Sequence, residues 1–216
     1  MSAEALSIIV PTRLIGKFPQ NAKLLSSKYD VHVVGGDVKP IGKARNVGAK
    51  KSHGGLLVFL DDDVGVCEDF LDLIVELARN GWVVSVGGTH CLAIRRDVFE
   101  RVWFDDWLGW FEDYDFYLRA KKLGGPFMFL DYKRYVDHYG ECRWNRSLKS
   151  WRIKSQFWMT QIVLRHKFFK QYWAKPEVSS KKTSYKRFFF VKNPVFLLVR
   201  GVGFFAHVIM RLRRKM

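Results

Sequence analysis

The chain of 216 residues is long enough for one globular domain with an appendage. Its composition excludes a disordered protein, because 48% of the residues are hydrophobic and 27% are charged. The formal net charge of +16 is unevenly distributed: residues 1–140 hold 18 Lys and Arg against 19 Asp and Glu, whereas residues 141–216 hold 19 against 2. Any partner attracted by positive charge is therefore expected to bind the C-terminal part.

The start of the chain and the cysteines indicate the compartment. The apolar run 6–10 is short and is broken by Pro11, so it is not typical of a secretory signal. Cys67, Cys91 and Cys142 are odd in number and widely spaced, which argues against a disulfide framework and against a zinc site. We therefore expect a cytoplasmic protein.

Short apolar runs alternate with helical patterns along the first 140 residues. Four runs end in turn-forming or polar residues and predict strands, over 6–10, 31–34, 56–60 and 83–86. Helical spacing covers 43–52 and 69–80, and a helix over 112–123 is followed by the strand-like segment 127–130. This alternation predicts an α/β fold with a mainly parallel central sheet flanked by helices. From residue 144 onward the pattern changes to basic, aromatic helices.

Acidic residues end the third predicted strand. Asp61, Asp62 and Asp63 follow the run Leu-Leu-Val-Phe-Leu directly. Carboxylates at a strand end suit Mg²⁺ or Mn²⁺, which bind one or two carboxylates together with substrate phosphates. The alternative is that these acids cap the next helix. We favour a metal–diphosphate site, because that helical pattern begins only near Glu68 and three adjacent negative charges repel one another.

Ligands of open α/β sheets bind beyond the carboxyl ends of the strands. The residues that follow the first two predicted strands, 11–13 and Asp37, therefore join the acids in one predicted site.

Four blocks of sequence occur in a recognisable order. Residues 7–12 read Ser-Ile-Ile-Val-Pro-Thr, and residues 44–49 read Ala-Arg-Asn-Val-Gly-Ala. Residues 54–63 read Gly-Gly-Leu-Leu-Val-Phe-Leu-Asp-Asp-Asp, and residues 110–124 read Trp-Phe-Glu-Asp-Tyr-Asp-Phe-Tyr-Leu-Arg-Ala-Lys-Lys-Leu-Gly. Together they resemble family-2 glycosyltransferases, which have the GT-A fold of nucleotide-diphospho-sugar transferases. The resemblance covers roughly residues 6–170.

The resemblance implies an inverting, metal-dependent transfer of a sugar from a nucleotide-diphospho-sugar to an acceptor hydroxyl. Asp61 and Asp63 would be the acids of the Asp-x-Asp motif, which contact the nucleotide ribose and the metal. Asp113, beside Glu112, would be the base that takes the acceptor proton. Asp37 lies where the family often has an acid against the nucleotide base, although the strand here ends Val-Val-Gly-Gly-Asp-Val and not with the family's Asp-Asp-Gly-Ser.

Two further sites follow from the same resemblance. The segment 87–90, with Gly88, Thr89 and His90, would line the donor-sugar pocket; the alternative is a simple turn. His138 would complete the metal or diphosphate site; the alternative is a structural histidine.

The chemistry of sugar transfer requires charges of both signs. A departing nucleoside diphosphate needs positive charge, and Lys43 and Arg45 are the cations that precede Asp61–Asp63, which we call the acidic edge. An acceptor hydroxyl needs a carboxylate within hydrogen-bond reach. The acids at 112, 113 and 115 also suit the start of a helix. The family pattern favours Asp113 as the base and leaves the role of Glu112 open.

The predicted donor-binding residues are Pro11, Thr12, Arg13, Asp37, Lys43, Arg45, Asn46, Asp61, Asp62, Gly88 and Thr89. The predicted metal ligands are Asp61, Asp63 and His138.

Other nucleotide-binding classes fit less well. Neither Gly-x-Gly-x-x-Gly after the first strand nor Gly-x-x-x-x-Gly-Lys-Ser/Thr is present. Sugar-phosphate nucleotidyltransferases share a related fold, but their Gly-rich loop after the first strand is matched here only by Gly16.

The predicted organisation is a catalytic domain over residues 1–143 and a helical, basic and aromatic extension over 144–216. In the last part, 185–216, Arg200 interrupts the apolar run 194–210 and basic residues flank it. This pattern favours a helix lying in the surface of an anionic membrane, with a re-entrant insertion as the alternative. Such a tail suggests a lipid-linked or cell-surface glycan as the acceptor.

Two alternatives for the extension remain. Basic residues among aromatics are also typical of single-strand nucleic-acid binders, but the tail is too apolar for a polyanion groove, so no specific nucleic acid is expected. For residues 144–173, the aromatic side chains equally suit the core of a helical subdomain.

Overall fold

The structure is a computed structural model in which the chain forms two compact units, residues 1–142 and 143–216. It describes residues 5–13, 16, 18–81, 83–86, 90–124, 126–130 and 136–138 of the first unit, with 86 and 136–138 described by their backbone. In the second unit it describes 157–158, 160–162, 164–166, 202 and 205, all of them helical. Most of the predicted extension 144–216, and the tail 185–216 apart from two residues, therefore lies outside the described residues. Among the residues that are described, no helix is both long enough and apolar enough to cross a membrane.

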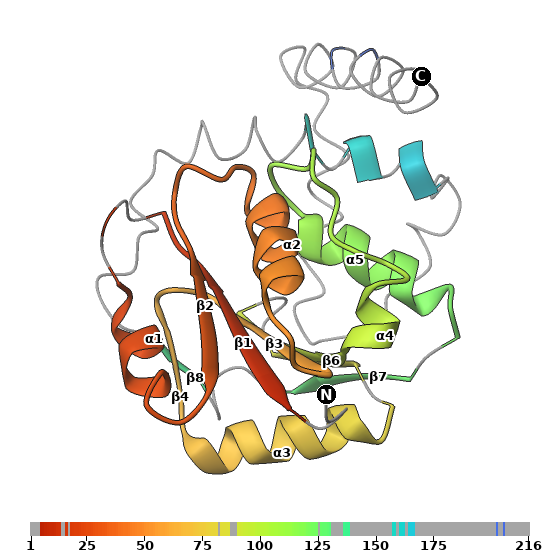
Figure 1. Ribbon diagram of the computed structural model, residues 1–216. Helices are drawn as coiled ribbons and strands as arrows, with labels where there is room; N and C mark the ends of the chain where they lie inside the picture. Colours follow the sequence, from red (N-terminus) through yellow and green to blue (C-terminus); the bar gives the residue numbers. More distant parts are fainter. Residues whose placement is uncertain are drawn as a thin grey trace. The chain divides into compact units, whose positions relative to one another are not determined.

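A six-stranded sheet forms the centre of the first unit (Figure 1). Its strands, in spatial order, are β2 (Asp30–Val34), β1 (Leu6–Pro11), β3 (Leu56–Leu60), β6 (Cys91–Arg95), β5 (Val83–Val86) and β7 (Phe127–Leu130). Strand β1 pairs in parallel with β2 and β3, and β5 pairs in parallel with β7, whereas β6 is antiparallel to both of its neighbours. The predicted α/β fold with a mainly parallel sheet is confirmed, and the sequence did not predict β6.

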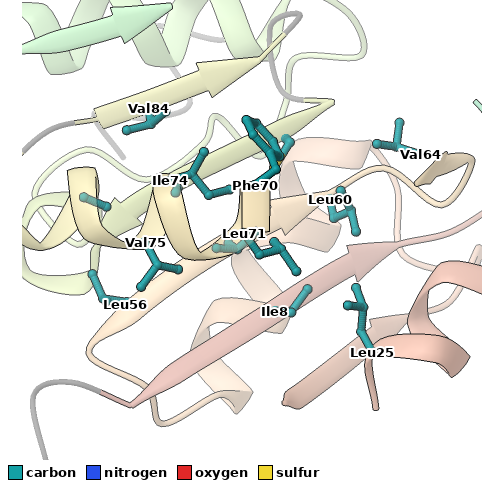
Figure 2. Close-up of a cluster of buried hydrophobic side chains, with 14 of the residues drawn as sticks. Ile8, Leu25, Leu56, Leu60, Val64, Phe70, Leu71, Ile74, Val75 and Val84 are labelled. Atoms are coloured by element: carbon teal, nitrogen blue, oxygen red, sulfur yellow. The ribbon is translucent and has the colours of Figure 1, made fainter. Parts of the chain in front are cut away.

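The inner strands β1, β3, β5 and β6 are largely apolar because helices cover both faces of the sheet. Successive side chains point to opposite faces, so Ile8 and Ile9 of β1 enter two different cores. On one face, Ile8 packs with Leu71 and Ile74 of α3 (Glu68–Arg79), as Figure 2 shows. On the other face, Ile9 belongs to a cluster with many aromatic rings: Phe59, Phe99, Phe104 and Phe116.

Three predicted helices are present within a few residues of their expected limits. They are α2 (Ile41–Lys51), α3 and α5 (Glu112–Lys121), predicted over 43–52, 69–80 and 112–123. In Figure 1, α2 and α5 lie on one side of the sheet and α3 lies on the other. Two short helices were not predicted, α1 (Gln20–Leu25) and α4 (Arg96–Phe99).

Helix α2 packs tightly against the sheet and is anchored at its end. A Cβ atom at Gly48 would lie 2.4 Å from Cγ2 of Ile9, so the backbone of α2 approaches β1 closely. Just beyond the sheet, Arg96 donates hydrogen bonds to the carbonyl oxygens of Ala49, Ser52 and Gly54, at 2.7 to 2.9 Å. These bonds satisfy carbonyl groups at the end of α2 that have no partner within the helix.

A second, two-stranded sheet lies beside the site. Strand β4 (Val64–Val66) follows the acids Asp61–Asp63, and it pairs antiparallel with β8 (Val136–His138). In this register Val64 lies opposite His138. The pairing therefore brings the backbone of residue 138 next to the acidic turn.

Candidate active site

The acids and Thr12 meet at one edge of the sheet, because β1, β2 and β3 are parallel and end there together. Thr12 directly follows β1, and its Oγ1 donates a hydrogen bond of 2.7 Å to Oδ2 of Asp62, which follows β3. The amide of Thr12 donates to the carbonyl oxygen of Val34, the last residue of β2, at 2.9 Å. The ends of three strands are thus joined at the predicted position of the ligand.

Asp61 accepts hydrogen bonds from three side chains. Its Oδ1 accepts a hydrogen bond of 2.8 Å from Nη2 of Arg45, and its Oδ2 accepts one of 2.8 Å from Nδ1 of His90. Its backbone carbonyl oxygen accepts a bond of 2.8 Å from Nδ2 of Asn21. Both carboxylate oxygens of Asp61 therefore already have a protein partner.

These contacts shift the pKa values of Asp61 and His90 in opposite directions. Burial would raise the pKa of Asp61, but the hydrogen bond from His90 and the charge of Arg45 outweigh it and hold the pKa below its usual value. The hydrogen bond to Asp61 raises the pKa of His90, and the charges of Asp61 and Asp63 act in the same direction. The pair is thus stabilised as imidazolium and carboxylate.

Arg45 connects this acidic edge to the start of α5. Its guanidinium is buried, with the side chain 1% exposed, and its Nη1 donates a hydrogen bond of 2.7 Å to Oε1 of Glu112. The guanidinium carbon lies 5.2 Å from the ring centroid of Phe104. The predicted role of Arg45 was that of a cation available to the diphosphate; in the structure it is enclosed by protein and engaged by two acids.

The acids at the start of α5 differ in their surroundings. Glu112 is buried against Arg45, whereas Asp113 is partly exposed and its Oδ1 accepts a bond of 2.8 Å from the amide of Tyr114. Asp115 is fully buried, and its Oδ2 accepts a bond of 2.8 Å from Nε of Arg119. Of these three acids, Asp113 is the one that reaches solvent.

Burial also raises the pKa values of Glu112 and Asp113. For Glu112, burial is the main cause, and the adjacent charge of Asp113 adds to it while Arg45 opposes it. For Asp113, burial again dominates, with the charge of Asp61 acting in the same direction. A carboxylate with a raised pKa is a stronger proton acceptor when it is ionised.

The residue before this acid pair adopts an unusual backbone conformation. Phe111 has φ of +58° and ψ of 25°, the left-handed region that non-glycine residues rarely occupy. Such conformations persist where the surrounding structure enforces them. Here the turn at Phe111 aims the start of α5, with Glu112 and Asp113, towards the acidic edge.

Asn46, next to Arg45 on α2, holds the segment that leads to this turn. Its Nδ2 donates to the carbonyl oxygen of Phe104 at 2.8 Å and to Oδ1 of Asp106 at 2.7 Å. Its Oδ1 accepts a bond of 3.0 Å from the amide of Phe104. Like Arg45, Asn46 is buried and bonded to protein.

The remaining predicted residues lie around this centre. Arg13, Asp37 and Lys43 are exposed, and Pro11 is buried. The loop before Asp37 lies against Arg13, because a Cβ atom at Gly36 would be 2.5 Å from the carbonyl oxygen of Arg13. Gly88 and Thr89 lie outside the described residues, and His138 is placed by its backbone, opposite Val64.

The site offers oxygen ligands, but few of them. No group of three or more His, Cys, Asp or Glu side chains within the described ranges is arranged to hold a metal ion. Asp61 and Asp62 already accept hydrogen bonds, and Asp63 lies near enough to raise the pKa of His90. This donor set fits Mg²⁺ or Mn²⁺ held by one or two carboxylates, with the other positions filled by a diphosphate and water.

One residue of the site, Asn21, was not predicted, and another, His90, was expected at the donor-sugar pocket but bonds to Asp61. Asn21 lies on α1, which the sequence did not predict, and no motif contains it. His90 directly precedes β6, and the amide of Asp61 donates to its carbonyl oxygen at 3.0 Å. Because β6 runs antiparallel to β3, it begins where β3 ends, and this brings His90 to Asp61.

No protein-family model and no curated protein matches the sequence. Solved structures do match. Glucosyl-3-phosphoglycerate synthase from Mycobacterium tuberculosis, in complex with Mn²⁺, UDP and phosphoglyceric acid, is 13% identical with a TM-score of 0.58, over 75% of this chain and 78% of that one. The mannosyltransferase PcManGT from Pyrobaculum calidifontis, in complex with GDP-Man and Mn²⁺, is 15% identical with a TM-score of 0.54, over 94% and 75%.

Staphylococcus aureus TarS 1–349 in complex with UDP is 12% identical with a TM-score of 0.50, over 76% of this chain and 66% of that one. The chain spans 64% of another TarS 1–349 structure and 44% of a further TarS structure. At these identities the likeness shows the fold. The chain has a GT-A-like fold of the nucleotide-diphospho-sugar transferases, which confirms the resemblance at the level of the fold.

Proposed function

We propose that the protein is a glycosyltransferase of the hexosyltransferase type, which moves a sugar from a nucleotide-diphospho-sugar to an acceptor hydroxyl. One observation carries the proposal: Arg45 bonds both to Asp61 at the end of β3 and to Glu112, the neighbour of Asp113, at the start of α5. Asp61, to which we assign donor binding, and the neighbour of Asp113, to which we assign proton removal, therefore share one bonded partner. Two structures with the same fold, PcManGT and glucosyl-3-phosphoglycerate synthase, contain Mn²⁺ with GDP-Man or UDP, which supports the class of donor and the metal.

The residues of this site have separate roles in the proposed reaction. Asp63 and Asp61 would hold Mn²⁺ or Mg²⁺ near residue 138, and the metal would supply positive charge to the diphosphate. The residues that would surround the nucleotide are Thr12, Asp62, Asp37, Arg13 and Lys43. Asp113 removes the proton from the acceptor hydroxyl, whose oxygen bonds to the anomeric carbon as the bond from that carbon to the phosphate oxygen breaks. A single displacement of this kind inverts the configuration at the anomeric carbon.

We further propose a cytoplasmic enzyme that is held at an anionic membrane by residues 185–216 and acts on a lipid-linked or cell-surface glycan. Val202 and Phe205, the two described residues of this tail, are helical and are 55% and 68% exposed. Residues three apart lie on one side of a helix, so both apolar side chains lie on the same helix face. Within the described ranges, Cys67 and Cys91 form no disulfide.

A hydrolysis screen tests the proposal. Full-length protein is incubated with UDP-, GDP- and dTDP-sugars and Mn²⁺ or Mg²⁺, and release of the nucleoside diphosphate is measured. We expect release from at least one donor, and we expect EDTA and Asp63→Ala to abolish it. Asp69→Ala, which removes an exposed carboxylate from the first turn of α3, is the matched control and should retain activity.

The opposite results have distinct meanings. Hydrolysis that survives both EDTA and Asp63→Ala would contradict the metal site. Absence of binding and of hydrolysis with every donor, in the presence and absence of a lipid extract, would contradict the proposed activity.

A further inference from the structure

The guanidinium of Arg45 is the point at which the two halves of the site touch. Its Nη2 lies 2.8 Å from Oδ1 of Asp61, which follows β3, and its Nη1 lies 2.7 Å from Oε1 of Glu112, which begins α5. Arg45 itself lies on α2. A planar guanidinium can bond to two acids at fixed directions, whereas a lysine ammonium is a single point charge. One side chain thus fixes three elements relative to one another.

The burial of Arg45 indicates that its side chain holds these elements together and does not bind phosphate. The side chain is 1% exposed and lies over the ring of Phe104. Both of its Nη atoms are bonded to acids. Because the side chain is 1% exposed, a diphosphate could reach the guanidinium only if the surrounding side chains moved.

The packing of α2 supports the same role. A Cβ atom at Gly42 would lie 3.0 Å from the carbonyl oxygen of Asp105 and 3.5 Å from Cβ of Glu112, so α2 runs close beside the segment that leads into α5. Asn46 holds that segment through Phe104 and Asp106. Helix α2 therefore offers a rigid support from which Arg45 can set the position of Glu112 and of its neighbour Asp113.

We propose that Arg45 is a positioning residue that fixes the separation between the donor-binding acid Asp61 and the base Asp113, and that it acts through Glu112 and does not bind the diphosphate. The inference rests on the proposed glycosyltransferase function. It assigns Glu112 to the same linkage and not to proton transfer. It also predicts that loss of the linkage slows the reaction more than it weakens donor binding.

The test is a double-substitution cycle with Arg45→Lys and Glu112→Gln, singly and together, in the full-length chain. The donor and metal identified by the hydrolysis screen are used. The dissociation constant of the corresponding nucleoside diphosphate with Mn²⁺ is measured by calorimetry, and kcat is measured by donor hydrolysis. Lys51→Met removes an exposed cation from the same helix and is the matched control.

We expect Arg45→Lys to lower kcat by about 10²-fold, the loss that a misplacement of about 1 Å can cause, while the dissociation constant changes only a few-fold. Glu112→Gln should lower kcat in the wild-type background. It should have little further effect in the Arg45→Lys background, because the linkage is already broken there. Lys51→Met should leave both quantities unchanged.

Different outcomes overturn different parts of the argument. If Arg45→Lys weakens nucleotide binding by about tenfold or more with kcat retained, or if the two substitutions act additively, Arg45 is not a positioning residue. Should Arg45→Lys fail to fold, as judged by circular dichroism, Glu112→Gln alone decides, and unchanged kcat in that variant overturns the inference. A wild-type protein that binds and hydrolyses no nucleotide-sugar overturns the proposed function itself.

Discussion

At the level of single residues, Asp113 combines two conflicting properties. Burial raises its pKa, so the fold disfavours the ionised form. The proposed reaction requires that same form, because only a carboxylate accepts the proton of the acceptor. Residues in catalytic sites commonly reduce the stability of the fold in this way.

The first prediction concerns the activity of Asp113→Asn. The substitution removes the proton acceptor but retains the shape and the ability to accept a bond from the amide of Tyr114. We expect the affinity for the nucleotide-sugar to persist and transfer to fall by about 10²–10⁴-fold, the usual contribution of a general base. Steady-state kinetics and calorimetry measure the two quantities. Turnover near the wild-type value would mean that another group is the base.

The same substitution gives a prediction about stability and pH. Because the folded-state pKa of Asp113 is raised above 3.8, the folded chain binds more protons than the unfolded chain between these two pKa values. The free energy of unfolding therefore falls as the pH rises through this window. Asp113→Asn removes that loss and should raise the free energy of unfolding at pH 7 by about 1 kcal/mol, with the gain shrinking as the pH approaches 4.

Urea denaturation in EDTA across this pH range provides the measurement. Asp69→Asn, at an exposed position, should show no comparable gain. A variant less stable than wild type at pH 7 would contradict the raised pKa.

At the level of elements, α2 contributes most to the site because it is both close to the sheet and rigid. Its Gly48 lies against Ile9. Its Arg45 and Asn46 hold the acidic edge and the approach to α5. The bonds from Arg96 to Ala49 and Ser52 secure its end. A shift of this helix would therefore displace both Asp61 and Glu112, the neighbour of the proposed base Asp113.

Gly48→Ala tests how tightly α2 packs. In an exposed helix, alanine in place of glycine stabilises by about 0.5–1 kcal/mol. Here the new Cβ atom would lie 2.4 Å from Cγ2 of Ile9, so we expect the opposite sign, a loss of about 1–3 kcal/mol. Thermal and urea unfolding report the change, with Lys51→Ala as a surface control on the same helix. A stabilised Gly48→Ala protein would show that α2 lies farther from β1.

The sequence predicted those helices and strands that can be recognised from residues within the segment itself. The buried run 56–60 and the helices α2, α3 and α5 have periodicity and turn residues of their own, and all of them are present in the structure. Strand β6 is apolar over Cys91–Ile94, but its assignment depends on pairing with β3 and β5, which no local pattern reveals. The expectation of a mainly parallel sheet therefore missed its one antiparallel strand.

In the candidate site, too, the residues at strand ends were predicted, whereas contacts between residues far apart in the sequence were not. The acids at 61–63 stand directly after β3, where the pattern expects them, because strand ends can be recognised from sequence. The contacts of Arg45 could not be predicted, since Glu112 is 67 residues away and nothing in the segment 44–49 indicates that a charged side chain is buried. The contact of His90 with Asp61 was not predicted, because it depends on the direction of β6.

At the level of the whole molecule, the distribution of charge assigns the two proposed roles, catalysis and membrane attachment, to different parts of the chain. The first 140 residues are nearly neutral and contain the acidic site, whereas the rest contains 19 Lys and Arg. A basic residue near an anionic membrane contributes roughly 1 kcal/mol to binding, and apolar side chains add a component that salt does not screen. Membrane attachment and catalysis should therefore be separable by substitution.

Val202→Ser together with Phe205→Ser tests this separation in the full-length chain. Both side chains are exposed, so we expect the fold and donor hydrolysis to be retained. Because burial of one such side chain contributes about 1.5–3 kcal/mol, binding to vesicles that contain anionic lipid should weaken at least tenfold. Phe18→Ser changes a residue that is 55% exposed in the first unit and is the matched control.

Vesicle co-sedimentation at low and high salt measures the attachment. Salt should release the wild-type protein only in part. Tight binding of wild-type protein to single-stranded RNA, with no binding to vesicles, would replace the membrane proposal by a nucleic-acid one.

Strand β7 at the edge of the sheet has a consequence for the behaviour of the protein in concentrated solution. Among the described strands it pairs with β5 alone, its sequence is Phe-Met-Phe-Leu, and Phe129 is 41% exposed. An uncharged, apolar edge is a template for a strand of another molecule, whereas the opposite edge, β2, carries Asp30 and His32. Self-association should therefore begin at β7. A positive charge placed there, as in Phe129→Lys, should raise the concentration at which the protein stays monomeric in light scattering.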